Sequence, residues 1–378
     1  MKGHIRHLFP GGNTSKGFYS FYKYILPQKD ARKIICIKGG PGTGKSSIIK
    51  TIGEYFNEKG YNIEFHHCSS DNNSLDGVVI RGLNIALLDG TSPHVVDPKN
   101  PGAVDEILNL GQFWNEEGFK ANKSKIINLN NCISETFQRA YKYISASKII
   151  HDSWSKLNSE AVNISKLNHL KENLKNEIFK TDISEAGTDR HLFATAFTPN
   201  GIITYIDNLY SEYKTIYALQ GEPGTHKSDI LEYLSCEALK RGHYVEIFHH
   251  PLIPEQIEHV LIPDLSIAIL TSNELNKKVF PGIQIQLNEL QTKEILTKNN
   301  SKIQEEKEMF YLLLNKGLNI ISQAKKLHDE LETYYIPNMN FDELNVVLEN
   351  LISKLTKYEN STKIEDTFNQ SKKGLYFI

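Results

Sequence analysis

The chain has 378 residues, a formal net charge of −2 and a hydrophobic content of 39%. This length exceeds what one compact core usually holds, so we expect two or more domains. The nearly balanced charge gives no electrostatic reason to expect a nucleic-acid partner. No apolar run approaches the roughly 20 residues of a membrane-spanning helix, and the start lacks the apolar stretch of a secretory signal, so we expect a cytoplasmic protein without membrane contact.

In chain order, the first elements predict an α/β domain. An apolar run at 33–38 predicts a strand, which a glycine-rich loop joins to a helix with apolar residues at helical spacing, ending near Gly60. Further strands are predicted at 61–67 and 85–88. Strands that alternate with helices indicate a parallel sheet with helices on both faces. A Pro-Gly turn at 101–102 is followed by a long segment, nearly free of Gly and Pro, that predicts a helical hairpin.

The same elements then occur a second time. RHLF occurs at 6–9 and at 190–193, and GGPGTGKS from Gly39 is answered by GEPGTHKS from Gly221. NIALLDG at 84–90 is answered by SIAILTS at 266–272, again 182 residues later. His151-Asp152 is answered by His328-Asp329 in the helical segments. Matches in one order at nearly constant spacing indicate a gene duplication.

We therefore predict two tandem P-loop NTPase domains of the α/β class, each followed by a helical segment. The expected limits are 1–118 for the first domain, 119–182 for its helical segment, 183–291 for the second domain, 292–360 for the second helical segment and 361–378 for a tail.

The segment that starts at Gly39 matches the phosphate-binding motif GxxxxGK[ST], directly after a strand and before a helix. Its glycines let the backbone point N–H groups at phosphate oxygens, and the helix N-terminus adds partial positive charge. Lys45 is expected to reach the β- and γ-phosphates, and Ser46 to bind Mg²⁺. The predicted nucleotide-binding residues are Gly39, Gly40, Pro41, Gly42, Thr43, Gly44, Lys45, Ser46 and Ser47.

Two aspartates are candidates for the chemistry beside this loop. Asp89 ends the apolar strand 85–88, where a carboxylate can hold Mg²⁺ from the sheet edge; the alternative is an aspartate that only opens a turn. Asp71 follows the second predicted strand, where it could contact a substrate or act as a base. The alternative for 68–77 is a solvated turn followed by a helix that Ser74 caps.

Several other residues are weaker candidates for a role in the site or in the fold. His94 could touch a phosphate or an acceptor, or lie in a proline-stiffened loop. Arg6, Arg139 and Arg190 are candidates for an arginine finger across the two domains. His66-His67, which recurs as His249-His250, is interpreted as a strand-end pair with a role in the fold.

The second copy departs from the motif. His226 replaces the last loop glycine, where an imidazole would intrude on phosphate space or force the backbone out of its φ range, and Thr271 replaces Asp89. Gly221, Gly224, Lys227 and Ser228 persist, so weak nucleotide or anion binding remains open, but we expect no hydrolysis there. The second half is interpreted as structural or regulatory.

Four blocks, HLFPGGNTSKGFYSFY, GGPGTGKS, CSSDNNSLDGV and LLDGTSPHVVDPKNPGAVDEILNLGQFW, resemble an uncharacterised bacterial family of tandem P-loop ATPases. The resemblance covers nearly the whole chain. It implies nucleotide binding by 39–47 and supports Asp89 as the acid on the metal side, but it implies little about a substrate. The second loop of that family is closer to GxxGKS than His226 allows.

The sequence therefore favours an enzyme that binds ATP and Mg²⁺ in its first half. It is expected either to transfer the γ-phosphate to a nucleotide or small-molecule acceptor, with Asp71 near the acceptor, or to hydrolyse ATP and move the two halves. The alternative is a nucleotide-dependent switch with little turnover that acts on a protein partner through its helical arms. No base-selecting NKxD motif is present, which lowers the case for GTP.

Overall fold

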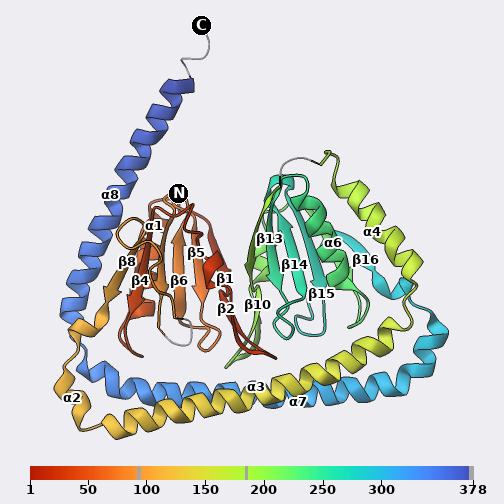
Figure 1. Ribbon diagram of the computed structural model, residues 1–378, viewed down its shortest axis with the longest axis horizontal. Helices are drawn as coiled ribbons and strands as arrows, with labels where there is room; N and C mark the ends of the chain where they lie inside the picture. The colour runs from red at the N-terminus through yellow and green to blue at the C-terminus, as the bar shows by residue number, and fades with distance from the viewer. Residues whose placement is uncertain (92–94, 184–185, 374–378) are drawn as a thin grey trace.

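The computed structural model describes residues 1–91, 95–183 and 186–373, with side chains up to residue 359. Two β-sheets stand side by side above a pair of long helices (Figure 1). The first half contains β1 Ile5–Leu8, β2 Gly11–Thr14, β3 Gly17–Ser20, β4 Lys33–Lys38, α1 Lys45–Glu58, β5 Ile63–His67, β6 Leu75–Ile80, β7 Ile85–Asp89, β8 Asp105–Asn109, α2 Glu116–Lys120, α3 Lys123–Ser159 and α4 Ile164–Ile178. The second half contains β9 Thr188–Leu192, β10 Thr195–Thr198, β11 Gly201–Thr204, α5 Ile206–Tyr210, β12 Thr215–Gln220, α6 Lys227–Leu239, β13 Tyr244–His249, β14 Ile257–Ile262, β15 Ile267–Ser272, β16 Ile283–Gln286, α7 Lys293–Tyr335 and α8 Phe341–Lys373.

Each half has one six-stranded sheet, with the order β1-β5-β6-β7-β4-β8 in the first and β16-β12-β15-β14-β13-β9 in the second. The two orders are the same when read from opposite ends, which supports the duplication. Most neighbours are parallel, but β6 and β14 run antiparallel to both of their neighbours. The expected α/β class is therefore confirmed, with sheets that are mixed rather than wholly parallel.

The alternative considered for 68–77, a turn followed by a capped helix, is wrong in its helix, because Leu75–Ile80 form strand β6. Its Val78-Val79-Ile80 run is fully buried, and β-branched side chains favour a strand over a helix. A Cβ on Gly77 would lie 3.0 Å from the side chain of Leu88 and 3.2 Å from the oxygen of Leu87. The glycine thus lets β6 pass close to β7.

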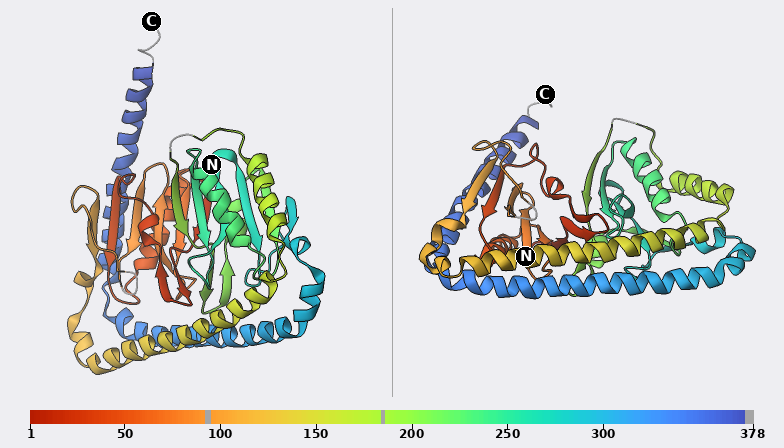
Figure 2. Two further views of the ribbon diagram at one scale, coloured as in Figure 1. Left: turned by 45° about the vertical axis from the view of Figure 1, so that its right-hand side comes forward. Right: turned by 60° about the horizontal axis from the view of Figure 1, so that its bottom comes forward.

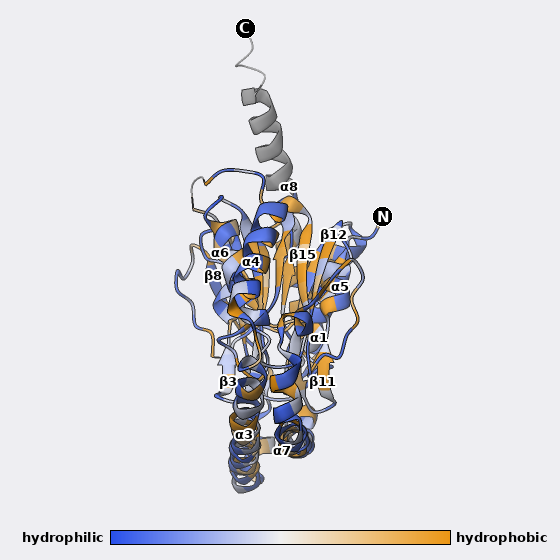
Figure 3. Ribbon diagram, turned by 90° about the vertical axis from the view of Figure 1, so that its right-hand side faces the viewer, coloured by the Kyte–Doolittle hydropathy of each residue, from blue (hydrophilic) through white to orange (hydrophobic). Residues whose placement is uncertain are grey.

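The second sheet has helices on both faces, as expected, because α5 packs through Ile206 and Leu209 on the face opposite α4 and α6. The α-helices that cover the first sheet lie on one face. In the first half α1 and α8 pack on one face around Ile48, Ile52 and Leu351. The other face is covered by the short 3₁₀ helix Tyr22–Tyr24 and by Ile25, which follows it. In the second half α4 and α6 cover one face, and the strands are the most hydrophobic part of the molecule in the end-on view (Figure 3).

The two halves meet along the outer strands β1 and β9. Phe9 and Phe193 form an antiparallel bridge, and both are fully buried. The side chain of Asn208 accepts from the His7 N–H and donates to the Ile5 oxygen, both at 2.9 Å, so it hydrogen-bonds the free edge of β1. Edge strands are usually protected against unwanted pairing, and here the other half provides the protection.

A buried charge cluster crosses the same boundary. Arg190 donates to both oxygens of Glu64 at 2.7 and 3.0 Å, and Arg6 donates to both oxygens of Glu246 at 2.5 and 3.1 Å. Each arginine therefore pairs with a glutamate of the opposite half. Arg6 and Arg190 serve as structural ion pairs, which removes both from the arginine-finger candidates.

The predicted helical segments form crossing arms, defined here as α3 and α7. Helix α3 leaves the first half and ends beside the second, and α7 runs back antiparallel beside it (Figures 1 and 2). Neither arm folds back as a hairpin. The helices that follow, α4 and α8, instead pack on the half that the arm has reached. Helix α8 continues to Lys373, so most of the expected tail is helical.

Backbone hydrogen bonds join the base of each arm to the end of the other. Asn115 N–H donates to the Asn338 oxygen at 2.8 Å, and Asn163 N–H donates to the Leu290 oxygen at 2.9 Å. In the described part of the chain, the search for a helix with the length and apolar character of a membrane span finds none.

The repeated histidines lie in the region where the halves meet, in a register that differs by one residue from the sequence comparison. His67 corresponds to His249, because Nδ1 of His7 lies 2.8 Å from Nε2 of His67 and Nδ1 of His191 lies 2.7 Å from Nε2 of His249. His66 corresponds to Phe248. The predicted role in the fold is consistent with these pairs.

Because these histidines are buried, we expect the folded protein to lose stability in acid. Burial lowers the pKa of His66 and His67 to about 4 and that of His249 to about 3. The unfolded chain protonates them near pH 6.5, so it binds more protons than the folded chain between pH 6.5 and 4. We expect stability to be full above about pH 7 and to fall by roughly 1–2 kcal/mol per histidine by pH 5.

Urea unfolding at pH 7.5 and pH 5.0 measures this loss. The carboxylates of the interface stay ionised at pH 5, because their pKa values are lowered. His66→Phe, which copies Phe248, should reduce the pH dependence. Equal unfolding free energies at the two pH values in the unsubstituted chain would refute the histidine account.

Candidate functional site

Loop 39–46, named here for the connection after β4 together with the first two residues of α1, lies at the edge where the parallel strands end. Gly42 and Gly44 have φ values of +63° and +88°, in the left-handed region that favours glycine. A Cβ on Gly42 would lie 2.8 Å from Ile336, which follows α7. The loop therefore needs these glycines both for its own conformation and for the close approach of the second arm.

Lys45 folds back over this loop. Its ammonium group donates to the Gly39 and Gly40 oxygens at 3.1 and 2.7 Å, and it lies 3.6 Å from a carboxylate oxygen of Asp89. The Ser46 hydroxyl accepts from the N–H of Leu75 at 2.9 Å. The structure thus brings together Lys45, Ser46 and Asp89, as the sequence predicted. The other oxygen of Asp89 accepts from the Thr91 N–H at 2.9 Å, so Asp89 also opens the turn.

Asp76 is a site residue that the sequence reasoning missed. The antiparallel register pairs Gly77 with Leu88, so Asp76 lies across from Asp89 on the neighbouring strand. Asp76 is only 4% exposed and accepts from the Tyr22 hydroxyl at 2.5 Å. Burial and the charge of Asp76 raise the pKa of Tyr22 well above its usual value, so the tyrosine remains a donor. The duplication carried a signal, because Glu258 occupies the equivalent place 182 residues later.

Asp71 also faces this site, but it has local partners. Its carboxylate accepts from the Ser74 hydroxyl at 2.8 Å and lies 3.2 Å from the ammonium group of Lys325 on α7. Asp71 therefore links the strand edge to the second arm. His94 falls outside the described residues. Arg139 lies on α3, and its described hydrogen bond goes to Gln323 of α7 at 3.5 Å and not to the glycine loop.

A cavity of about 1470 Å³ lies over loop 39–46. Its walls are the glycine loop with Asp71, Asp76 and Asp89, the β2–β3 turn at 15–18, and both crossing arms. From α3 come apolar and amide groups such as Phe137 and Gln138, and from α7 come Lys325 and His328. The N-terminal glycine-rich segment thus contributes a wall of this cavity through its turn.

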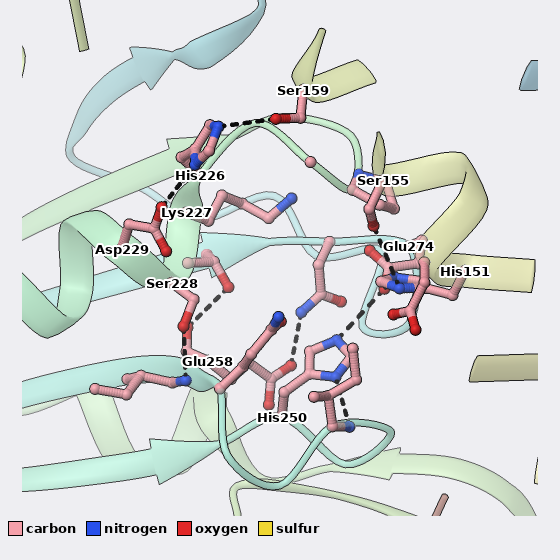
Figure 4. A pocket seen from close by; sticks show the side chains of 18 of the residues that line it. His151, Ser155, Ser159, His226, Lys227, Ser228, Asp229, His250, Glu258 and Glu274 are labelled. Atoms are coloured by element: carbon pink, nitrogen blue, oxygen red, sulfur yellow. Dashed lines mark hydrogen bonds and ion pairs between the residues drawn. The ribbon is translucent and has the colours of Figure 1, made fainter. Parts of the chain in front are cut away.

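Loop 221–228 of the second half keeps the same backbone shape. Gly224 has a φ of +84° and His226 one of +64°, so the histidine adopts the left-handed conformation of Gly44. Its ring is 2.6 Å from a carboxylate oxygen of Asp229 and 3.2 Å from the Ser159 hydroxyl (Figure 4). Of the two effects expected of His226, the change of backbone φ is wrong, because the residue keeps the left-handed conformation; its ring lines the cavity beside the loop.

The side chains of this second loop also repeat those of the first. Lys227 donates to the oxygens of Gly221 and Glu222, and Ser228 accepts from the Ile257 N–H at 2.9 Å. Thr271, in place of Asp89, donates to the backbone oxygen of Glu258 at 2.8 Å. A cavity of about 470 Å³ adjoins the loop.

The buried carboxylate of Glu274 belongs to the lining of this smaller cavity. Glu274 lies 2.9 Å from Nε2 of His151 on α3 and 3.4 Å from Nε2 of His250. Although burial favours the neutral acid, the two histidines hold the pKa of Glu274 well below its usual range. Burial lowers the pKa of Lys227 in spite of the nearby charges of Glu274 and Glu222.

Comparison of the chain with models of protein families, with curated proteins and with solved structures finds no significant match. The family resemblance in the sequence therefore stays an interpretation, and the functional argument depends on the residues and their geometry.

Proposed function

We propose that the chain is a Mg²⁺-dependent P-loop phosphotransferase that binds ATP at loop 39–46 and transfers its γ-phosphate to a small acceptor. The observation that carries the proposal is the position of Lys45 on the loop oxygens, 3.6 Å from Asp89, beneath a large cavity. The GxxxxGK[ST] spacing, the two left-handed glycines and the start of α1 support a phosphate site.

The residues of the first site divide into two groups. Lys45 and the amides of loop 39–46 would hold the phosphates, with Lys45 released from its bonds to the loop oxygens. Ser46, Asp89 and Asp76 form the oxygen-rich side that suits Mg²⁺, which prefers one or two carboxylates together with phosphate oxygens. Bound there, Mg²⁺ would neutralise negative charge on the phosphates.

The size of the cavity favours an acceptor beside the nucleotide. Ligand sites are usually about 300–1,000 Å³, and this cavity of about 1470 Å³ exceeds that range. The part of its wall that α3 provides combines aromatic, amide and cationic groups, including Phe137, Gln138 and Lys142. Asp71, near Lys325, is the candidate to receive the acceptor's hydroxyl proton.

The test is ADP formation from Mg²⁺-ATP by the full chain, with and without a panel of nucleosides, nucleotides and small hydroxyl compounds. We expect at least one acceptor to stimulate ADP formation tenfold or more and to appear phosphorylated by mass spectrometry. Asp71→Asn should reduce the stimulated rate without weakening nucleotide binding. ADP formation that no acceptor changes would instead support a simple ATPase.

A second candidate is a nucleotide-dependent switch, and the course of α7 favours it. Lys307 of α7 pairs with Glu222 of the second loop at 3.3 Å. Tyr335, the last residue of α7, lies over Gly40 of the first loop. A rigid helix that touches both loops could report the state of one to the other. Tight retention of ATP with no turnover under any condition would favour this function.

A further inference from the structure

We propose that the acceptor of the first site is a nucleoside monophosphate, with its base on α3 beside Phe137 and its phosphate on Lys142. The inference rests on the proposed function and names the substrate class of the same cavity. It depends on the length of the wall that α3 provides, on the order of the groups along the arms, and on a lysine without a carboxylate partner at the far end.

One face of α3 forms a long wall of the cavity over loop 39–46. The residues that α3 contributes recur every three or four positions from Asn130 to Ile149, as the residues of one helix face do. At a rise of 1.5 Å per residue this face is about 28 Å long. The wall therefore continues well beyond the glycine loop, with room for a second ligand beside ATP.

The course of α7 gives the position of the candidate base along the cavity. Near its end, the Cβ of Glu332 would lie 3.4 Å from a Cβ on Gly42 of the glycine loop. Lys325, which lies 3.2 Å from the carboxylate of Asp71, comes seven residues earlier and so about 10 Å back along the helix. Asp71 thus lies along the cavity from the loop, where an acceptor would meet the γ-phosphate.

Helix α3 runs antiparallel to α7, so its later residues lie farther from the glycine loop (Figure 1). Arg139 of α3 donates to Gln323 of α7, which places Phe137 near the level of Lys325. Lys142 follows Phe137 by five residues, about 7.5 Å farther along α3. The order in the cavity is therefore the glycine loop, the candidate base and then Lys142.

The middle of the wall suits a planar base. The rings of Phe137 and Tyr141 lie one turn apart, with centroids 6.0 Å from each other and planes inclined by 28°. The Tyr141 hydroxyl donates to the fully buried Asn13 at 2.9 Å, which fixes this ring. Gln138 lines the cavity beside them, and among the described residues no hydrogen bond engages its amide. An aromatic face beside an available amide can stack on a base and hydrogen-bond its edge.

The far end of the wall is positively charged. Lys142 lines the cavity, and in the ranges that the structure describes no carboxylate lies within ion-pair distance of its ammonium group. Lys16 lines the same end, because Ser145 of α3 donates to the backbone oxygen of the preceding residue, but Lys16 is paired with Glu255. A phosphate group is a suitable partner for the unpaired ammonium group of Lys142.

A nucleoside monophosphate has the three parts that this order requires: a sugar hydroxyl, a base and a phosphate. The hydroxyl oxygen attacks the γ-phosphorus of ATP, the bond from that phosphorus to the bridging oxygen breaks, and ADP leaves with the electron pair. Asp71 receives the hydroxyl proton. Because Lys142 holds the acceptor's own phosphate away from the reaction, the product carries two separate monophosphates and not a diphosphate.

The experiment offers the full chain Mg²⁺-ATP with the common nucleoside 5′-monophosphates, their parent nucleosides and ribose 5-phosphate. We expect at least one monophosphate to give a kcat/KM ten times that of its nucleoside and of ribose 5-phosphate, and phosphorus NMR to show two monoesters in the product. Equal use of the nucleoside or the sugar phosphate, or a diphosphate product, would overturn this inference and keep the proposed function.

Lys142→Ala should lower kcat/KM for the preferred monophosphate at least tenfold. Lys125→Ala is the matched control, an exposed lysine of the same helix outside the cavity lining, and should change it less than twofold. Equal values for the two variants would rule out Lys142 as the phosphate ligand. Thermal unfolding of both variants checks that the fold is intact.

Calorimetric titration separates this inference from the proposed function. The preferred monophosphate, or each of the series when no transfer is seen, is titrated into the full chain with Mg²⁺ and a non-hydrolysable ATP analogue. Binding that Lys142→Ala weakens at least tenfold, without any transfer from ATP, would support the ligand class and refute the phosphotransfer. No binding of any monophosphate would overturn the inference, even if another acceptor were phosphorylated.

Discussion

Replacing Lys45 by alanine is expected to lower ATP turnover at least about 100-fold and to weaken ATP binding greatly, whereas Lys227→Ala should keep turnover within about threefold. The two lysines have the same backbone partners in their loops. Only Lys45, however, lies beside an aspartate at the end of the neighbouring strand, because Thr271 has replaced that residue in the second half. Transfer should therefore depend on the first lysine alone.

The two variants are matched controls for each other. Each removes one partly buried ammonium group from a loop of the same shape, so their effects on stability should be similar. Steady-state ADP release gives the turnover, and thermal unfolding gives the stability. If both changes abolished turnover equally while the protein stayed folded, the second loop would take part in the reaction and the asymmetry proposed here would be wrong.

The largest effect on stability is expected from Arg190→Met, which should reduce the free energy of unfolding by about 3–5 kcal/mol. The Arg190 guanidinium is 4% exposed; it donates to both oxygens of Glu64 and to the backbone oxygens of Tyr24 and Ile25. Methionine fills much of the space but leaves a buried carboxylate and two carbonyl groups without these donors. Breaking one side of a buried pair costs more than the pair contributes.

Arg81→Met is the matched control, because Arg81 also donates to Glu64, at 2.8 Å, but is 34% exposed. Its loss should cost about 1 kcal/mol or less. Arg190→Lys should not restore stability, since one ammonium group cannot reproduce the planar set of donors. Urea denaturation followed by circular dichroism measures all three. A similar small loss for Arg190→Met and Arg81→Met would show that the cluster does not hold the halves together.

Local patterns were enough to predict the duplication, the strands around 33–38 and 85–88, the helix α1 and the loop between them. The loop motif also located Lys45, Ser46 and Asp89 in one place, because the end of a parallel strand and the start of the next helix share one edge of the sheet. These features depend on neighbours in the sequence or on a known spacing. The sequence therefore contained enough to find the core of the first site.

The missed features depend on contacts between distant segments. Strand β6 is buried on both faces and shows no alternation, so its pattern did not separate a strand from a helix. Because β6 was missed, so was its antiparallel direction, which brings Asp76 to the strand ends beside Asp89. The periodicity of the arms predicted helices but carried no information on which half each would reach.

The crossing arms also determine what a single break in the chain would do. A cut between α4 and β9 gives two fragments, but each keeps a helix in the core of the other: α4 packs on α6, and Leu351 and Leu355 of α8 pack against the first sheet. The fragments are thus exchanged partners, like the chains of a domain-swapped dimer. Neither half has its complete hydrophobic core alone, so the second half cannot be deleted without exposing the core of the first.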